Sequence, residues 1–300
     1  MNILRSRPKS RQEKKRQIQV ARRSLKVMAG TFVLTVSLIL CMIFVPKKNA
    51  LDTLQKREAK AKETGKMTEE QLAKQKANGS ESDDTICTAD LTDDEILEGL
   101  NLLLIGDSIA VDVTDDFYEM FPNSVSDTKI GRITSLGKQV LDSYIDEKKW
   151  EGEGVIFASL SNSPINGELE DIREKIGKDM PLFLTTVRIP HDTFEEESNS
   201  KIKKFVEENN HTYLIDWYAA SEGHDEYFDA DDTHLLPAGA KAYAKCIKEA
   251  VLAAYKKENI EIPKSRLSSG ADTSTDSSNA SSTDSNTDSS NDNRTDTSTE

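Results

Sequence analysis

Cysteine and histidine are scarce in this chain, which contains three cysteines and four histidines among 300 residues. So few cysteines exclude a disulfide-stabilised scaffold, and no Cys, His, Asp or Glu residues have the spacing of a metal site. A glycine-rich phosphate-binding loop is also lacking. We therefore predict neither a metal nor an organic cofactor. The composition, with 36% hydrophobic residues, also excludes collagen and a polytopic membrane protein.

Net positive charge is confined to the amino-terminal end. Residues 1–26 contain ten basic side chains and one acidic one, a net charge of +9, which leaves −23 on residues 27–300 within the total of −14. A nucleic-acid-binding protein needs its positive patch on the folded domain. The charge distribution therefore predicts no nucleic-acid partner.

One long run without charge, residues 27–45, reads VMAGTFVLTVSLILCMIFV and is followed by PKK. A helix of about 19 residues just spans the roughly 30 Å of hydrocarbon in a bilayer. The basic flank before it predicts a cytoplasmic amino terminus and an exported remainder, in a single-pass protein of the cell membrane. A cleaved signal peptide is the alternative, but the run is unusually long and no small-x-small cleavage site follows. Outside the membrane, Cys87 and Cys246 either form a disulfide or remain two separate thiols.

The segments on either side of the central domain have little apolar character. Residues 46–94 are rich in Lys, Glu, Ala and Gln without a sustained heptad, which predicts a solvated, partly helical stalk. In it, Thr68 and Gln71 have the spacing of a capping box for a short helix. Residues 263–300 become almost purely Ser, Thr, Asp and Asn, and this composition predicts a disordered tail.

Strand-like apolar runs alternate with helical patterns in the central domain, residues 95–262. The strand-like runs lie at 102–105, 125–130, 155–160, 182–187 and 212–215; the helical patterns lie at 112–120, 134–145, 169–176 and 196–208, with a last helix from Pro237. The runs start about 25–30 residues apart, as in a strand–helix repeat. We therefore predict an α/β domain with a five-stranded parallel sheet covered on both faces, in which ligands bind beyond the carboxyl ends of the strands.

Two short motifs at opposite ends of this domain carry the candidate catalytic residues. Ser108 ends the motif GDS at 106–108, directly after the first strand and before a helix, where free amides and the helix dipole favour negative charge. The motif DDTH at 231–234 stands just before the last helix, and its spacing lets Asp231 orient the imidazole of His234 toward the serine. Ser, Asp and His in this order predict a hydrolytic triad. Each motif alone is also typical of a helix cap or a surface turn.

These motifs together resemble the SGNH (GDSL-like) hydrolases. Residues 129–132 (KIGR) are similar to the second conserved block of that family, and residues 159–165 (SLSNSPI) are similar to the third. The resemblance implies a three-layer, flavodoxin-like fold. It also implies an oxyanion hole formed by the backbone amides of Ser108 and Gly131 and the side chain of Asn162.

Three further segments are similar to the extracytoplasmic domain of peptidoglycan O-acetyltransferases: VRIP at 187–190, LIDWY at 214–218 and HLLPAGAKAY at 234–243. The resemblance, which covers residues 100–255, implies acyl transfer through Ser108 to a cell-wall glycan. Members of that family often carry a fused multispanning acyltransferase domain. Since such a domain is absent here, we expect a separate multispanning membrane protein to donate the acetyl group. Arg188 either contacts substrate or forms a structural ion pair.

The chain departs from the family pattern at three glycine positions, which are occupied by Leu160, Ser163 and Asp232. A side chain at Leu160 adds bulk where backbone approaches closely in the family. Displacement of Asn162 would remove an oxyanion donor, which typically contributes about 3–4 kcal/mol. The sequence therefore leaves three functions open: an O-acyltransferase, a carbohydrate acetylesterase, and a wall-associated binding protein without turnover.

Overall fold

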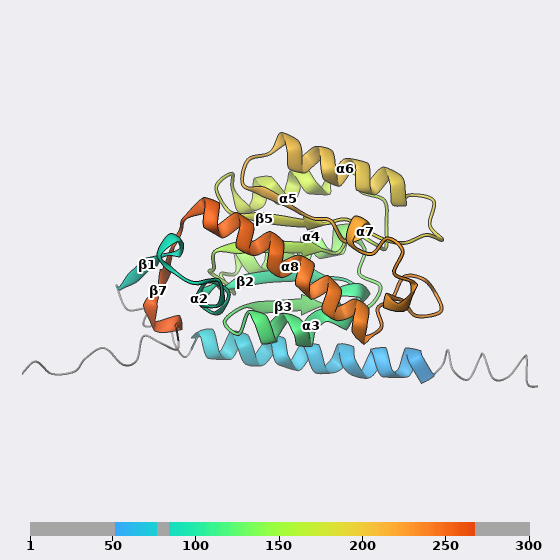
Figure 1. The fold of residues 1–300 in the computed structure, drawn as a ribbon, viewed down its shortest axis with the longest axis horizontal. Helices are drawn as coiled ribbons and strands as arrows, with labels where there is room; N and C mark the ends of the chain where they lie inside the picture. Colours follow the sequence, from blue (N-terminus) through green and yellow to red (C-terminus); the bar gives the residue numbers. More distant parts are fainter. Residues whose placement is uncertain (1–51, 77–83, 268–300) are drawn as a thin grey trace, which may run out of the picture.

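The computed structural model describes residues 52–76 and 84–267 (Figure 1). The basic segment 1–26, the predicted anchor 27–45 and the tail from residue 268 lie outside the described residues. Within the two described ranges, no helix combines the length and the apolar character needed to cross a bilayer.

Five parallel strands form the central sheet, and each coincides with a predicted strand-like run. The strands are β2 (Leu102–Gly106), β3 (Val125–Thr128), β4 (Gly154–Ala158), β5 (Leu182–Thr185) and β6 (Thr212–Ile215). Their order in the sheet is β3-β2-β4-β5-β6. This order is that of a flavodoxin-like fold. The predicted parallel five-stranded sheet is therefore confirmed.

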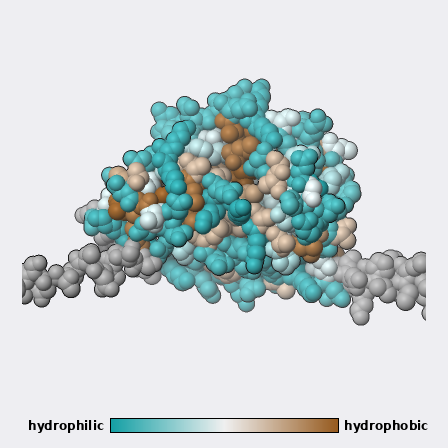
Figure 2. All heavy atoms as spheres, viewed as in Figure 1, coloured by the Kyte–Doolittle hydropathy of each residue, from teal (hydrophilic) through white to brown (hydrophobic). Residues whose placement is uncertain are grey.

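Helices cover both faces of the sheet, as predicted. One face packs against α2 (Asp93–Gly99), α3 (Ser108–Met120) and α8 (Pro237–Glu258), and the other against α4 (Thr134–Asp146), α5 (Glu168–Ile176) and α6 (Glu195–Glu208). Successive residues of β2 point to opposite faces, so Leu103 and Leu104 belong to different halves of the core. Each buried aliphatic side chain of this kind contributes about 1.5–3 kcal/mol. The outer surface over α8 is mostly hydrophilic (Figure 2).

The fold continues on both sides of residues 95–262. Strand β1 (Thr85–Cys87) pairs antiparallel with β7 (Glu261–Pro263), and the short helices η1 (Thr88–Asp90) and η3 (Lys264–Arg266) adjoin them. A capping box formed by Thr92 and Glu95 begins α2. Cys87 and Cys246 are free thiols. The compact body therefore includes the end of the predicted stalk and the start of the predicted tail.

Residues 52–76 form one helix that lies beside α3, drawn in blue along the lower edge of Figure 1. Lys60 donates a hydrogen bond to the carbonyl oxygen of Asp112 on α3 at 2.8 Å. Thr64 and Thr68 are buried, and the hydroxyl of Thr68 donates to the carbonyl oxygen of Ser126 at 2.5 Å. The helical prediction for this segment is right, but the helix packs against the domain. The predicted capping box at Thr68 is wrong because Thr68 lies in mid-helix.

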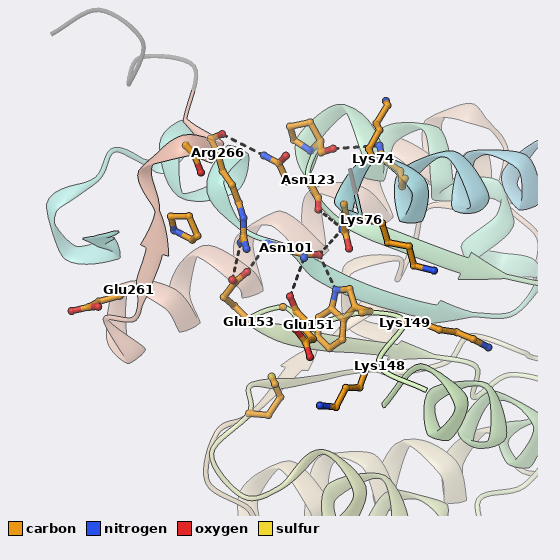
Figure 3. Close-up of a pocket in the computed structure, with 18 of the residues that line it drawn as sticks. Lys74, Lys76, Asn101, Asn123, Lys148, Lys149, Glu151, Glu153, Glu261 and Arg266 are labelled. Carbon is orange, nitrogen blue, oxygen red and sulfur yellow. Dashed lines mark hydrogen bonds and ion pairs between the residues drawn. The ribbon is translucent and has the colours of Figure 1, made fainter. Parts of the chain in front are cut away.

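A polar hollow lies at the amino ends of the strands (Figure 3). Asn101, which immediately precedes β2, accepts hydrogen bonds from the indole of Trp150 at 2.8 Å and from Gln75 at 3.0 Å. Arg266 forms an ion pair with Glu153 at 2.7 Å. These contacts fasten the end of the helix 52–76 and the carboxyl end of the described chain to this edge of the sheet. They lie at the opposite edge from the predicted triad.

Candidate active site

The carboxyl end of β2 turns sharply into α3. A Cβ atom at Gly106 would lie 2.1 Å from the Cβ atom of Ala110, so a larger residue would push the helix away from the strand. Asp107 caps α3 by accepting a hydrogen bond from the N–H of Ile109 at 3.0 Å. Ser108 is the first residue of α3, and N–H groups in the first turn of a helix lack intrahelical acceptors.

The turn after β2 lies at the point where the winding of the sheet reverses. Strand β2 is flanked by β3 on one side and β4 on the other, and the chain moves outward from it in both directions. Ligands bind at such points, beyond the carboxyl ends of the strands. Asp107 and Ser108 follow β2, and residues 159–163 follow β4. Two of the predicted site segments are therefore neighbours at this edge.

Ser108, His234 and Asp231 form one chain of hydrogen bonds. Nε2 of His234 lies 3.0 Å from Oγ of Ser108, and Nδ1 lies 2.7 Å from Oδ2 of Asp231. The other carboxylate oxygen of Asp231 accepts hydrogen bonds from the N–H groups of Thr233 at 3.2 Å and His234 at 2.9 Å. The fold thus brings together a serine and a histidine that are 126 positions apart in the sequence.

The two acidic residues beside Ser108 and His234 have opposite pKa shifts. Partial burial acts to raise the pKa of Asp231, but hydrogen bonds from the backbone and imidazole of His234 outweigh it, so its pKa lies below 3.8. Asp231 is therefore ionised at neutral pH and stabilises a proton on Nδ1 of His234. Burial raises the pKa of Asp107, although hydrogen bonds from Ser161 and Ile109 oppose this shift. Asp107 is 0% exposed, and its carboxyl group stabilises the turn between β2 and α3.

The loop that carries Asp231 and His234 closes on itself. The N–H of Asp229 donates to the carbonyl oxygen of His234 at 2.8 Å. Asp232 adopts a left-handed conformation with φ of 54°, at the position where the resembling family has glycine. Aspartate enters this region more readily than most residues, because its short polar side chain bonds locally. The replacement at Asp232 is therefore compatible with the turn.

Asp112 is a site residue that the sequence prediction missed. It lies one turn after Ser108 on α3, and its Oδ2 accepts a hydrogen bond from the N–H of Leu235 at 3.1 Å. This bond fixes the residue next to His234. Burial raises the pKa of Asp112, against the opposing effects of that hydrogen bond and of Arg57. The spacing of four from Ser108, which puts both residues on one helix face, is the signal that the sequence offered.

The loop that contains the predicted oxyanion residue Gly131 is bound to the end of β2. Gly131 has a φ of 68°, which favours glycine. The N–H of Lys129 donates to the carbonyl oxygen of Gly106 at 3.2 Å, and the guanidinium of Arg132 donates to the same oxygen at 3.1 Å. The loop is thereby fixed to a residue two positions before Ser108.

Asn162, the predicted side-chain donor, is connected to the same turn. Its exposed amide nitrogen donates to Oγ of Ser161 at 3.3 Å. Ser161 in turn donates to Oδ2 of Asp107 through its N–H at 3.1 Å and its hydroxyl at 2.5 Å. Two hydrogen bonds therefore separate Asn162 from the residue next to Ser108.

The other two glycine replacements have structural roles. Leu160 is 0% exposed and fills the core on the side of α4 and α5. The hydroxyl of Ser163 accepts a hydrogen bond from the N–H of Thr134, the first residue of α4, at 3.1 Å. Leu160 therefore adds buried apolar area, and Ser163 satisfies an amide at a helix terminus.

Arg188 is not joined to the triad. Its guanidinium lies 4.8 Å from the ring centre of Phe228, and it donates to the carbonyl oxygen of Ser221 at 3.5 Å. It lines a small hollow together with Asp107 and Ser161, so its contact with substrate stays a prediction. Within residues 52–76 and 84–267, no group of three His, Cys, Asp or Glu side chains could hold a metal ion.

No protein-family model matches the chain. In a stretch of 146 residues, 34% are identical to "O-acetyltransferase OatA" of Staphylococcus aureus (strain NCTC 8325 / PS 47). This stretch is homologous to OatA. It covers 48% of this chain and 24% of OatA, so the chain spans about a quarter of the length of that relative.

Two solved structures are similar at lower sequence identity. The C-terminal catalytic domain of peptidoglycan O-acetyltransferase A (OatA) from Streptococcus pneumoniae, with a methylsulfonyl adduct, is 20% identical with a TM-score of 0.49. The comparison covers 55% of this chain and 99% of that one. A lipase/acylhydrolase from Enterococcus faecalis is 18% identical with a TM-score of 0.43, over 51% of this chain and 96% of the other.

Proposed function

We propose that this protein is a serine-dependent O-acyltransferase that moves acetyl groups onto a glycan of the cell envelope, such as peptidoglycan. The observation that carries the proposal is the hydrogen bond between Nε2 of His234 and Oγ of Ser108, with Asp231 on the other ring nitrogen. The homology to OatA, an O-acetyltransferase, supports the choice of the acetyl group. The choice of glycan is supported by the resemblance of residues 187–190, 214–218 and 234–243 to peptidoglycan O-acetyltransferases.

In the proposed mechanism, Ser108 is the nucleophile. Its Oγ attacks the carbonyl carbon of an O-acetyl ester while Nε2 of His234 takes its proton. The leaving alcohol then takes this proton, and an acetyl-serine remains. A sugar hydroxyl then attacks the acyl carbon of the acetyl-serine while Nε2 of His234 takes its proton. The bond from this carbon to Oγ breaks, and His234 returns the proton to Oγ, which regenerates Ser108. Asp231 keeps the imidazole in the tautomer that can accept the first proton.

The negative oxygen that develops in each step needs hydrogen-bond donors. We assign this role to the N–H groups of Ser108 and Gly131 and to the side-chain amide of Asn162. The contacts from Lys129 to Gly106 and from Ser161 to Asp107 support this assignment, because they fix both loops against the turn that carries Ser108.

The proposed arrangement in the cell follows from the sequence and from the docked helix. We assign residues 1–26 to the cytoplasm, 27–45 to the membrane and 268–300 to an extracytoplasmic tail. The helix 52–76 begins at the catalytic edge, where Arg57 contacts Asp229. The intervening residues 46–51 would span at most about 20 Å. This short reach supports an active site close to the bilayer, where a multispanning partner would present the acetyl group.

Two other functions make different predictions for the same assay. The full-length protein is incubated with a radiolabelled acetyl ester and a glycan acceptor, and acetate and acetylated glycan are quantified. A transferase yields acetylated glycan at the expense of acetate, whereas a carbohydrate acetylesterase yields acetate alone. A binding protein without turnover yields neither product, and its Ser108 fails to react with a fluorophosphonate.

Replacement of Asn162 by alanine is expected to lower kcat about 100- to 1,000-fold, because the amide acts on the charge that develops in the transition state. KM should change little for the same reason. The measurement is steady-state hydrolysis of a soluble acetyl ester by the full-length variant. The matched control is Asn166→Ala, since Asn166 is exposed in the same loop and bonds to the carbonyl oxygen of Pro164. A wild-type kcat for Asn162→Ala would show that Asn162 is not a donor of the oxyanion hole.

A further inference from the structure

The helix of residues 52–76 reaches the loop that carries two members of the proposed triad. Nη2 of Arg57 lies 2.9 Å from Oδ2 of Asp229, and Nη1 lies 3.7 Å from Oδ2 of Asp231. The Oδ2 atom of Asp231 is also the acceptor for the imidazole of His234. A single guanidinium therefore contacts both the triad carboxylate and the residue two positions before it.

Arg57 lies among several negative charges. Its side chain is 13% exposed, compared with 29% for Asp229 and 45% for Asp231. The charge of Arg57 also acts on half-buried Asp112. The pair with Asp229 is shorter and less exposed than the contact with Asp231, so it is the stronger of the two. The guanidinium thus links the carboxylates of Asp229 and Asp231 to the helix of residues 52–76.

The position of Arg57 is fixed because the helix is attached along its length. Lys60, Thr68 and Gln75 each donate a hydrogen bond to a backbone carbonyl oxygen of the domain, at 2.8, 2.5 and 3.0 Å. These contacts run from the catalytic edge of the sheet to its opposite edge. The helix therefore holds Arg57 at a defined place relative to α3 and Ser108.

Asp229 transmits this contact to the histidine. Its N–H donates to the carbonyl oxygen of His234 at 2.8 Å, and its carbonyl oxygen accepts from the N–H of Asp232 at 2.9 Å. The flanking residues Phe228 and Leu235 form an antiparallel β-bridge. Fixing Asp229 therefore fixes both arms of the loop.

We propose that Arg57 is a positioning residue and that the helix of residues 52–76 belongs to the catalytic unit. Through Asp229 and Asp231, the guanidinium holds the loop so that the imidazole of His234 faces Ser108. The proposal rests on the proposed function in taking Ser108 as the nucleophile. Since Arg57 acts through the loop, its loss should slow the reaction of Ser108 and leave substrate affinity unchanged.

Two variants remove the same ion pair from opposite sides. In the full-length protein, Arg57→Ala and Asp229→Asn are each expected to lower kcat about tenfold with KM unchanged, since small displacements of a catalytic base are costly. Arg57→Lys, which keeps the charge, should recover most of the loss. The double variant should lose no more than Arg57→Ala alone, because Arg57→Ala already removes the contact with Asp229. The rate at which a fluorophosphonate labels Ser108 should fall in parallel with kcat.

The matched control is Lys62→Ala, which removes one positive charge from the exposed side of the same helix and should leave kcat unchanged. Melting temperatures identify any variant that does not fold. If Arg57→Ala does not fold, kcat and KM of Asp229→Asn test the proposal by the same criteria. A wild-type kcat in the folded variant, or additive losses in the double variant, would overturn the positioning role. Wild-type activity in Ser108→Ala would instead overturn the proposed function.

Discussion

Replacement of Ser108 by alanine is expected to lower both acetyl transfer and ester hydrolysis by at least about 10⁴-fold. Alanine has no oxygen that could form the acetyl-enzyme, so the remaining route is direct attack of water on the ester. The fold should survive, because the substitution removes little volume and a single side-chain hydrogen bond, the one between Oγ of Ser108 and the imidazole of His234. Activity of the full-length variant is measured beside its melting temperature.

A serine elsewhere provides the control for this experiment. Ser143→Ala removes a hydroxyl that bonds to the carbonyl oxygen of Val140 within α4, far along the chain from the triad segments. Its activity and its labelling by a fluorophosphonate should equal those of the wild type, whereas Ser108→Ala should not be labelled. If Ser108→Ala retained wild-type turnover or labelling, the acyl-enzyme mechanism would have to be abandoned.

Replacement of Asp231 by asparagine is expected to lower kcat by about 10⁴-fold without opening the loop. The asparagine oxygen can still accept the N–H groups of Thr233 and His234, which Oδ1 of Asp231 accepts now. The amide nitrogen, however, would donate to Nδ1 of the imidazole. This contact selects the tautomer with a proton on Nε2, which cannot accept the proton of Ser108.

The same variant should also change the pH dependence of stability. Because the folded-state pKa of Asp231 is lowered from 3.8, its ionised form contributes stability above about pH 4, and this contribution is lost as the pH falls through the folded-state pKa. Asp231→Asn should therefore melt below the wild type at pH 7, and the difference should vanish in stronger acid. Asp232→Asn, the control in the same loop, should keep wild-type activity. An active Asp231→Asn would contradict the assignment of Asp231 as the residue that orients the histidine.

Much of the central domain could be predicted because its strands are buried on both faces. Such strands read as continuous apolar runs, and β2 and β4 are fully buried as the pattern requires. The pairing of Ser108 with His234 followed from the position of each motif at a predicted sheet edge. The parallel sheet brings all carboxyl ends of its strands to one side, so motifs far apart in the chain become neighbours there.

The helix of residues 52–76 shows what the sequence pattern left out. Its packed side combines Thr64, Thr68 and the partly buried Arg57 with two large apolar residues, Met67 and Leu72, so hydrophobic periodicity reveals the packed face poorly. Arg57 and Asp229 are 172 positions apart, and a charge pair of that separation leaves no local signal. The effect of leucine in place of glycine at position 160 likewise depends on the fold, which places the side chain of Leu160 in the core.

The sequence by itself predicted the five strands of the central sheet, the helices α3 to α6 and α8, and the turn at Gly106, because short-range periodicity and turn geometry encode these features. Its two short motifs also supplied the three residues of the proposed triad. Tertiary structure alone decided which distant side chains support these residues. Arg57 contacts Asp231, Asp112 accepts a hydrogen bond from Leu235, and Asp107 accepts one from Ser161. Such contacts depend on how whole elements pack in three dimensions, and the order of residues along the chain does not record that packing.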